Sequence, residues 1–192
     1  MEEGKTIKDF KLLVIGGSAG SLPVLFNLLP SLAYMPHVAI VIVLHRKSTS
    51  DSVLADIFAL RTTIPVKEIE DKEQISGGTI YIAPPDYHIL FENGGEISLD
   101  FSEKVNFSRP SIDVAFESAA QVYKSGLSCL LLSGASADGA KGLQEVNAFH
   151  GKVAVQDPAT ADSPYMPQQG LQHVPSCTVL HPNEIVSFIN AL

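Results

Sequence analysis

The sequence predicts an α/β fold in which helices cover both faces of a mostly parallel sheet. Short apolar, strand-like runs alternate with helix-like segments along most of the 192 residues, and this alternation is typical of sheets built from βαβ units. Hydrophobic residues make up 45% of the chain and charged residues 18%, as in a globular protein with a substantial core. The length suits one domain and no linker divides it, so we expect residues 1–192 to form a single domain.

The first part of the chain shows the alternation most clearly. The first strand ends at a pair of glycines, the first helix is stopped by Pro30, and Ser50 or Asp51 is the expected cap of the second helix. The expected elements are strand 11–15, helix 18–29, strand 37–44, helix 50–60 and strand 64–69.

The middle of the chain interrupts the alternation. Strand candidates at 79–83, 87–92 and 96–101 follow one another without a helix between them. Asn93-Gly94-Gly95, between the last two, is a hairpin signal because these residues adopt positive φ angles readily. We therefore expect an antiparallel hairpin insert or edge on the parallel sheet.

The alternation resumes in the last part of the chain. An apolar strand at 128–132 follows a helix, and Pro182 lies near the start of the final helix. The expected elements are helix 112–123, strand 128–132, helix 140–149, strand 152–156, strand 177–180 and helix 183–192.

The acidic composition limits the classes of partner. The formal net charge is -8 and the sequence pI is about 5.1, so nucleic acid and anionic membranes would gain no counterion release on binding. Cys129 and Cys177 each lie within an apolar run, as buried thiols in a reducing compartment do. The N-terminus lacks the apolar core of a signal peptide, and no apolar stretch approaches the roughly 20 residues that span a bilayer. We expect a cytoplasmic protein without membrane insertion.

Candidate catalytic residues follow the expected strands. In an open parallel sheet, ligands bind outside the carboxyl ends of the strands, where the strand order reverses. Ser18 follows the first strand in a glycine-rich loop, His45 ends the second, and Asp138 follows strand 128–132 in another glycine-rich turn. A serine, a histidine and an aspartate on one rim form the residue set that a nucleophilic triad requires.

The segment around Ser18 allows three interpretations. A dinucleotide-binding loop is the weakest, because serines occupy two of the three glycine positions and no acidic residue lies near residue 38. A nucleophile elbow matches Gly16-x-Ser18-x-Gly20, where the following helix start supplies N–H groups for an oxyanion. In the third interpretation Ser18 only caps the helix. Capping and catalysis are equally well supported by this segment alone.

Sequence spacing alone does not decide which residues act as the base and the acid. His45 alone fits a strand-end histidine with local hydrogen bonds, but strands about 4.8 Å apart would bring it near Ser18. Asp138 competes with Asp86 and Asp157, which follow other strands, and it could equally be a helix N-cap. The remaining histidines show no metal-ligand spacing, so we expect no metal site.

Six blocks of this sequence closely resemble the catalytic domain of CheB-type protein-glutamate methylesterases, in the order and spacing of that family. The resemblance covers nearly the whole chain, and the combination of blocks is far more specific than any one of them. The blocks are VIGGSAGS (14–21), VLHR (43–46), GGTIYIAPPDYHILF (77–91), SRPSIDVAFESAA (108–120), LLLSGASADGAKGL (130–143) and AVQDPATADSPYMP (154–167).

The resemblance implies a role for each candidate. Ser18 falls on the nucleophile, His45 on the general base, and Asp138 on the acid, which settles the choice that spacing leaves open. We expect the backbone N–H groups of Ala19 and Ala135 to form the oxyanion hole. The resemblance also implies a three-layer, doubly wound sheet with an antiparallel hairpin, and a reaction without metal or cofactor.

The implied activity is hydrolysis of glutamate methyl esters on methyl-accepting chemotaxis receptors, with glutamine deamidation by the same route. Arg109 is a candidate for binding the acidic receptor, and an equally good candidate for a structural role. The familiar enzyme carries an N-terminal receiver domain, whereas only residues 1–10 precede the first expected strand here. We therefore expect a stand-alone relative or an excised domain, with a separate receiver-domain protein as a candidate partner.

The alternative to an enzyme is a binding module in a signalling pathway that keeps the methylesterase fold without turnover. Ala19-Gly20-Ser21 supports it, because the resembled family has Thr or another small residue and then Gly-Gly after the serine. The presence of all three triad residues favours the enzyme.

Overall fold

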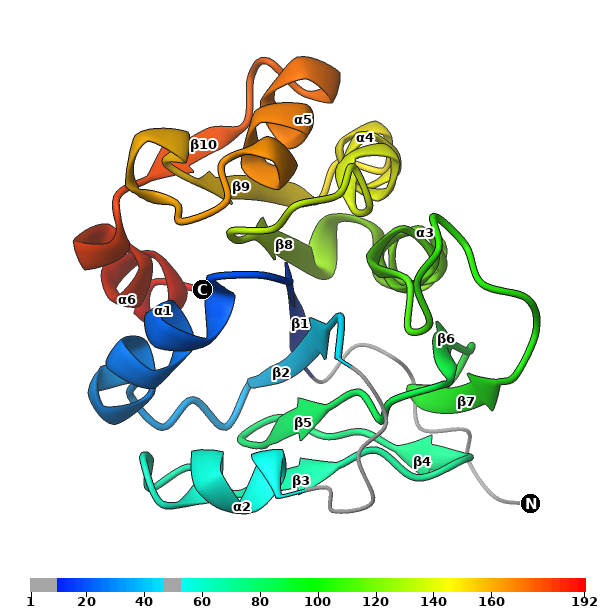
Figure 1. Ribbon diagram of the computed structural model, residues 1–192. Helices are drawn as coiled ribbons and strands as arrows, with labels where there is room; N and C mark the ends of the chain where they lie inside the picture. Colours follow the sequence, from blue (N-terminus) through cyan, green and yellow to red (C-terminus); the bar gives the residue numbers. More distant parts are fainter. Residues whose placement is uncertain (1–9, 47–52) are drawn as a thin grey trace, which may run out of the picture.

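The computed structural model describes residues 10–46 and 53–192 and has a seven-stranded parallel sheet at its centre (Figure 1). The strand order is β10-β9-β8-β1-β2-β5-β3, and every pairing in this sheet is parallel. The strands are β1 (Lys11–Gly17), β2 (Val38–Leu44), β3 (Val66–Glu68), β5 (Ile80–Ile82), β8 (Leu127–Leu131), β9 (Lys152–Gln156) and β10 (Thr178–Leu180).

Helices cover both faces of this sheet, so the three-layer α/β prediction is confirmed. Helices α1 (Ser21–Leu28) and α6 (Pro182–Asn190) lie on one face, and α3 (Ile112–Tyr123), α4 (Ala140–Ala148) and α5 (Tyr165–His173) lie on the other (Figure 1). The remaining helical segments are α2 (Leu54–Ala59) and the short 3-10 turns η1 (Leu29–Ser31), η2 (Lys124–Gly126) and η3 (Pro158–Thr160).

The apolar strands explain why both faces need a cover. Every residue of β2 is buried, and successive side chains of a strand point to opposite faces of the sheet. In β1, Leu12 and Val14 accordingly belong to the core cluster that includes α3 and α4, whereas Leu13 and Ile15 belong to the cluster that includes α1 and α6. Two hydrophobic cores result, one on each side of a single sheet.

The strand order reverses at β1. The chain passes from β1 through α1 to β2 on one side, and it returns through α3 to β8 on the other side of β1. In such doubly wound sheets, the loops at the carboxyl ends of the strands separate at the reversal and leave a crevice. The loop after β1 and the loop after β8 therefore border the expected position of a site.

The antiparallel part is a second, three-stranded sheet rather than an edge of the first. Its order is β4 (Glu73–Gln74), β7 (Glu96–Asp100) and β6 (His88–Phe91). The hairpin prediction is confirmed between β6 and β7, where Gly94 and Gly95 have φ angles of 99° and 84°. The assignment of 79–83 to the antiparallel insert is wrong, because β5 pairs in parallel with β2 and β3, and all three of its residues are buried.

Most other boundaries agree with the sequence analysis within a few residues, and helix 112–123 and strand 152–156 match. Helix 18–29 begins only at Ser21, because residues 18–20 form a turn. Helix α5 and strand β4 were not expected; α5 contains Pro167 and Gly170, which weaken a helical pattern. The expected caps Ser50 and Asp51 lie outside the described residues. Across the described ranges, no helix is long and apolar enough to cross a membrane.

Candidate active site

Ser18 lies in the turn between β1 and α1, at the carboxyl edge of the sheet. Its N–H donates to the carbonyl of Ser133 (2.9 Å), and its carbonyl accepts hydrogen bonds from the N–H (3.1 Å) and Oγ (2.6 Å) of Ser21. The N-cap of α1 is Gly20, in a left-handed conformation with no side-chain cap, so Ser18 does not cap this helix. A Cβ at Gly20 would lie 2.6 Å from Cβ of Asp162, which requires glycine there.

His45 follows β2 and makes one backbone hydrogen bond and two side-chain contacts. Its N–H donates to the carbonyl of Gly17 (3.2 Å), which places it beside the loop that holds Ser18. Its Nε2 lies 2.7 Å from Oδ2 of Asp138, and its Nδ1 lies 3.4 Å from Oγ of Ser108. Since Nε2 donates to a carboxylate, Nδ1 of the neutral imidazole is left as the acceptor.

Asp138 is fully buried, and both of its carboxylate oxygens accept several hydrogen bonds. Besides His45, the donors are the side chains of Asn106 and Ser111 (2.8 Å each) and the N–H groups of Ile112 (2.6 Å) and Asp113 (3.1 Å). The last two are the first N–H groups of α3, which no residue of that helix can accept. The carboxylate therefore lies at the positive end of a helix.

These contacts keep Asp138 ionised in spite of its burial. Loss of solvent by itself would raise the pKa of this carboxyl group, but the hydrogen bonds from His45, Asn106, Ile112 and Ser111 together lower the pKa below its ordinary value. An ionised acid that accepts from Nε2 fixes the orientation of His45, and it would stabilise the imidazolium form.

Asp113 forms the counterpart of Asp138 at the start of α4. Its Oδ1 accepts the N–H groups of Gly139 (2.9 Å) and Gly142 (2.7 Å), and its Oδ2 accepts the Asn106 amide (2.8 Å). Burial raises the pKa of Asp113 above its ordinary value, the N–H of Gly142 opposes that rise, and the charge of Asp138 adds to it. The start of α3 thus donates to the carboxylate of Asp138, and the start of α4 donates to the carboxylate of Asp113.

Four further residues of this site were not predicted from the sequence: Asn106, Ser108, Ser111 and Asp113. Three of them lie in the SRPSID segment, whose spacing gives no hint that it contacts the turn at 138. The buried His88 supports the same segment, because its Nδ1 accepts the N–H of Ser111 (3.1 Å). The resemblance block at 108–120 therefore contains Ser111 and the two N–H groups that bind Asp138, and the block at 77–91 contains the histidine that supports Ser111.

The two rival acids have other contacts. Asp157 caps η3 by accepting the N–H of Ala159 (2.9 Å). Asp86 borders a cavity with His45, but within the described residues no hydrogen bond joins these two side chains. In the ranges 10–46 and 53–192, no group of three or more His, Cys, Asp or Glu side chains is arranged to hold a metal ion.

Two cavities meet at His45 and Arg46. One, of about 190 Å³, is also lined by Ser18 and Leu22. The other, of about 390 Å³, is also lined by Phe107 and by the two residues that follow it. His45 therefore stands between the Ser18 turn and the loop that leads into α3.

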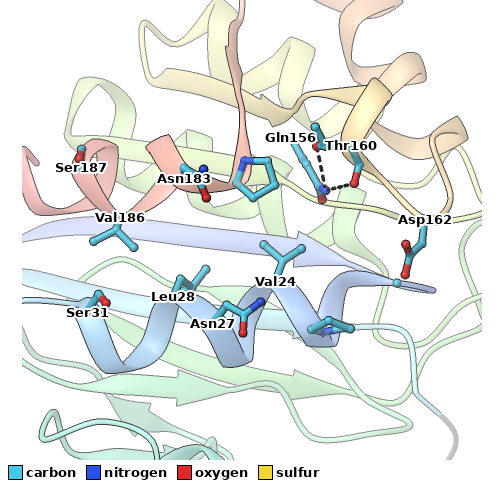
Figure 2. A pocket seen from close by; sticks show the side chains of 13 residues that line it. Val24, Asn27, Leu28, Ser31, Gln156, Thr160, Asp162, Asn183, Val186 and Ser187 are labelled. Atoms are coloured by element: carbon cyan, nitrogen blue, oxygen red, sulfur yellow. Dashed lines mark hydrogen bonds between the residues drawn. The ribbon is translucent and has the colours of Figure 1, made fainter.

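A larger cavity of about 560 Å³ lies between α1 and α6 (Figure 2). Apolar side chains such as Val24 and Val186 alternate there with amides and hydroxyls, and Asp162 and Gln156 border one end. Ser18 and His45 do not line this cavity, whereas they line one or both of the two smaller cavities.

Among the described residues, the loops after β1 and β8 each contain backbone N–H groups that are engaged and at least one that is not. The N–H groups of Ser18 and Gly134 are already bonded to the carbonyls of Ser133 (2.9 Å) and Ser163 (3.0 Å). Within the described part of the chain, no hydrogen bond engages the N–H of Ala19 or Ala135, which follow them. Both are in the loops that border the strand reversal, where an oxyanion hole would be needed.

Arg109 borders the cavity of about 390 Å³, and one nitrogen of its guanidinium group is engaged in two hydrogen bonds. Its Nη1 donates to the carbonyls of Phe101 (3.1 Å) and Ser102 (2.6 Å), and its Cζ lies 3.8 Å from the centroid of the Phe101 ring. Arg109 thus holds the segment before α3 against the end of β7 while it remains at the cavity wall.

Comparison with known proteins connects this geometry to one family. The family model described as CheB methylesterase matches residues 13–189. A relative from Leptospira interrogans, provisionally named a protein-glutamate methylesterase/protein-glutamine glutaminase, is 42% identical over 164 residues, which cover 85% of each chain.

A protein from Thermotoga maritima carries the same double name and is 35% identical over 153 residues, which are 78% of this chain and 44% of that protein. The crystal structure of the Thermotoga maritima CheB methylesterase catalytic domain superimposes with a TM-score of 0.89 at 32% identity. The superposition covers 95% of this chain and 98% of that one.

Proposed function

Because the chain belongs to the CheB methylesterase family, we propose that it hydrolyses methyl esters of glutamate side chains on methyl-accepting chemotaxis receptors. The relatives' names include a glutaminase, so glutamine deamidation on the same receptors is part of the proposal. Such a substrate faces the cytoplasm, and the proposal therefore assigns this single domain to that compartment.

Ser18 is the proposed nucleophile and His45 the proposed base. His45 Nδ1 accepts the hydroxyl proton as Ser18 Oγ attacks the ester carbonyl, and it then returns this proton to the departing methanol. A water molecule releases glutamate from the acyl-enzyme by the same steps in reverse. The observation that carries this proposal is the 2.7 Å contact of His45 Nε2 with the ionised Asp138, at a cavity that Ser18 also lines.

The oxyanion of the tetrahedral intermediate would bind the N–H groups of Ala19 and Ala135. Their availability supports this assignment, because the neighbouring N–H groups of Ser18 and Gly134 are already engaged. Each well-placed donor contributes about 3 kcal/mol to transition-state stabilisation in comparable sites. Arg109, at the cavity wall, is the proposed contact for an acidic group of the receptor.

The first test is replacement of Ser18 by alanine. Ser18→Ala should lose at least about 10³-fold in kcat for methanol release from membranes that contain methylated receptor. It should also lose labelling by a fluorophosphonate, which reacts with activated serines. Ser187→Ala, at an exposed position on α6, is the matched control and should behave as the parent protein.

Ser108 provides the sharpest check, because its Oγ is the hydroxyl that lies 3.4 Å from His45 Nδ1. If Ser108 were the nucleophile, Ser108→Ala would lose labelling and Ser18→Ala would retain it. We expect the reverse, with Ser108→Ala within about tenfold of the parent rate, because α3 begins only at Ile112 and no helix N-terminus directly follows Ser108. A parent protein that neither binds the fluorophosphonate nor releases methanol would instead support the non-catalytic binding module.

A further inference from the structure

The turn at 105–108 carries a bulky residue in a conformation that bulky residues avoid. The N–H of Val105 donates to the carbonyl of Ser108 (3.2 Å), and the N–H of Ser108 returns a bond of 2.9 Å, so the two residues close a tight turn. The two residues between them, Asn106 and Phe107, have φ angles of 52° and 62°. Asparagine tolerates this left-handed region, whereas phenylalanine is strained in it, and glycine is the usual residue at this second position.

Phe107 gains nothing from the fold that would offset this strain. Its side chain is 98% exposed, so it buries almost no apolar surface within the described chain. The turn itself is firmly held, because the Asn106 amide bonds both Asp113 and Asp138 at 2.8 Å. The result is an exposed aromatic ring at a fixed place on the wall of the cavity that His45 also lines. Strained residues of this kind are concentrated at functional sites.

Exposed apolar side chains also border the cavity of about 190 Å³ on the other side of His45. Leu22, Val53 and Ile57 line the cavity that contains Ser18, and they are 39%, 51% and 39% exposed. Scattered apolar residues on a surface need no explanation, but these residues and Phe107 lie on the two sides of one candidate base. A segment that delivered its ester to Ser18 would therefore contact apolar side chains on either side.

The charges around the Phe107 cavity favour an acidic occupant. Among the described residues, Arg46, Lys104 and Arg109 line this cavity together with one acid, Asp86, although the whole chain has a net charge of -8. Arg46 is paired with Glu68, whereas Lys104 is exposed and makes no hydrogen bond or ion pair within the described residues. This local excess of positive charge would attract a negatively charged segment.

We propose that Phe107 is a substrate-binding residue that packs against an apolar side chain of the receptor segment, close to the esterified glutamate. The occupant of this surface is an acidic polypeptide segment with apolar residues on both sides of its ester, and Lys104 meets one of its carboxylates. This inference rests on the proposed function, and it adds the feature by which the site would distinguish a receptor from a small ester.

The test compares two substrates in three variants. The kcat/KM for methanol release from methylated receptor membranes is divided by the kcat/KM for hydrolysis of p-nitrophenyl acetate, which is too small to reach both cavities. This ratio should fall about tenfold or more in Phe107→Ala and Phe107→Gly, mainly through a higher KM for the receptor. It should fall by a smaller factor in Lys104→Gln, and that loss should disappear at high salt. Leu60→Ala is the matched control, because Leu60 is 87% exposed and lines neither cavity.

Phe107→Gly separates binding from a structural role. Glycine relieves the left-handed strain, so the melting temperature of this variant should stay level or rise by up to about 3 °C, while its activity on the receptor falls. A melting temperature that drops together with activity on both substrates would assign Phe107 to the fold and overturn the inference. A ratio within twofold of the parent in both Phe107 variants would also overturn it and leave the proposed function intact. A parent protein that hydrolyses p-nitrophenyl acetate but releases no methanol from the receptor would overturn both.

Discussion

The starts of α3 and α4 hold two buried carboxylates in nearly the same surroundings, with opposite effects on their protonation. Asp138 accepts the first N–H groups of α3, and Asp113 accepts N–H groups from the first turn of α4. The pKa of Asp113 is nevertheless raised by its burial, whereas the pKa of Asp138 is lowered in spite of its burial. Helix N–H groups are therefore enough to bury a carboxylate here, but they do not by themselves lower its pKa below the ordinary value.

The difference comes from side-chain donors. Asp138 accepts hydrogen bonds from the side chains of His45, Asn106 and Ser111 in addition to two N–H groups. Within the ranges that the structure describes, Asp113 accepts one side-chain bond, from the same Asn106 amide. Asp138 comes just before α4 and binds the start of α3, whereas Asp113 lies in α3 and binds the start of α4. The geometry therefore depends on both sequence blocks, 108–120 and 130–143. Asp113 supports the architecture, and Asp138 has the additional contacts that the proposed catalysis needs.

Replacement of each acid by its amide gives the largest expected contrast. Asp138→Asn should lower kcat by about 10³–10⁴-fold, because an amide cannot hold the tautomer of His45 that leaves Nδ1 as a base. Asp113→Asn should stay within about tenfold of the parent, because its Oδ1 can still accept both N–H groups of α4. The measurement is kcat for hydrolysis of p-nitrophenyl acetate. Equal losses in the two variants would mean that the acids act as one structural unit.

Asn106→Ala should show how far the two acids depend on their shared donor. The variant removes the amide that donates to both Asp113 and Asp138. We expect the free energy of unfolding to fall by about 1–2 kcal/mol and kcat to fall about tenfold. Urea denaturation and steady-state kinetics measure these two effects. Asn147→Ala, at an exposed position on α4, is the control and should change neither the free energy of unfolding nor kcat. If Asn106→Ala keeps full stability, the bridge between the acids is not a stabilising contact.

Gly142→Ala should affect stability without a direct effect on kcat. A Cβ at Gly142 would lie 2.6 Å from Cβ of Phe116 and 3.2 Å from the carbonyl of Asp113, so it would push α4 away from α3. We expect a loss of about 1–3 kcal/mol in the free energy of unfolding, measured in urea. At Gly126 a Cβ would meet nothing within 4 Å, so Gly126→Ala should be neutral or slightly stabilising. Equal stabilities of the two variants would show that close packing between α3 and α4 does not contribute to stability.

Sequence reasoning reached the three-layer fold and the strand ends because both follow from local patterns. The apolar strands predict a doubly covered sheet, and strand ends alone place Ser18 and His45 on one rim. The same reasoning assigned β5 to the wrong sheet, because a short apolar run does not show with which strand it pairs.

The choice among three acids could not come from spacing, for a physical reason. What distinguishes Asp138 is a set of donors that lie far away in sequence, such as His45 at 93 residues and Ser111 at 27. Asp86 and Asp157 also follow strands, so the local pattern is the same for all three. The resemblance to a family selected Asp138, and the reason for that selection becomes visible only in the tertiary contacts.

The smallest expected effect, and the most direct test of the contrast between the two acids, is the pH dependence of stability. The lowered pKa of Asp138 means that the unfolded chain binds more protons at this group, so its stabilising contribution is present above the ordinary value of 3.8 and is lost as the pH falls through the folded pKa. The raised pKa of Asp113 has the opposite consequence: its contribution is present below 3.8 and is lost as the pH rises through the folded pKa.

Relative to the parent, Asp138→Asn should therefore become less stable as the pH rises through this acid range, whereas Asp113→Asn should become more stable. Urea denaturation of the parent and both variants at several pH values from about 3 to about 6 measures the two slopes. The pH-independent cost of each substitution shifts a curve without changing its slope, so the signs can be compared directly. Slopes of the same sign would mean that the two helix starts impose the same electrostatic environment, and that the side-chain donors of Asp138 do not account for its ionisation.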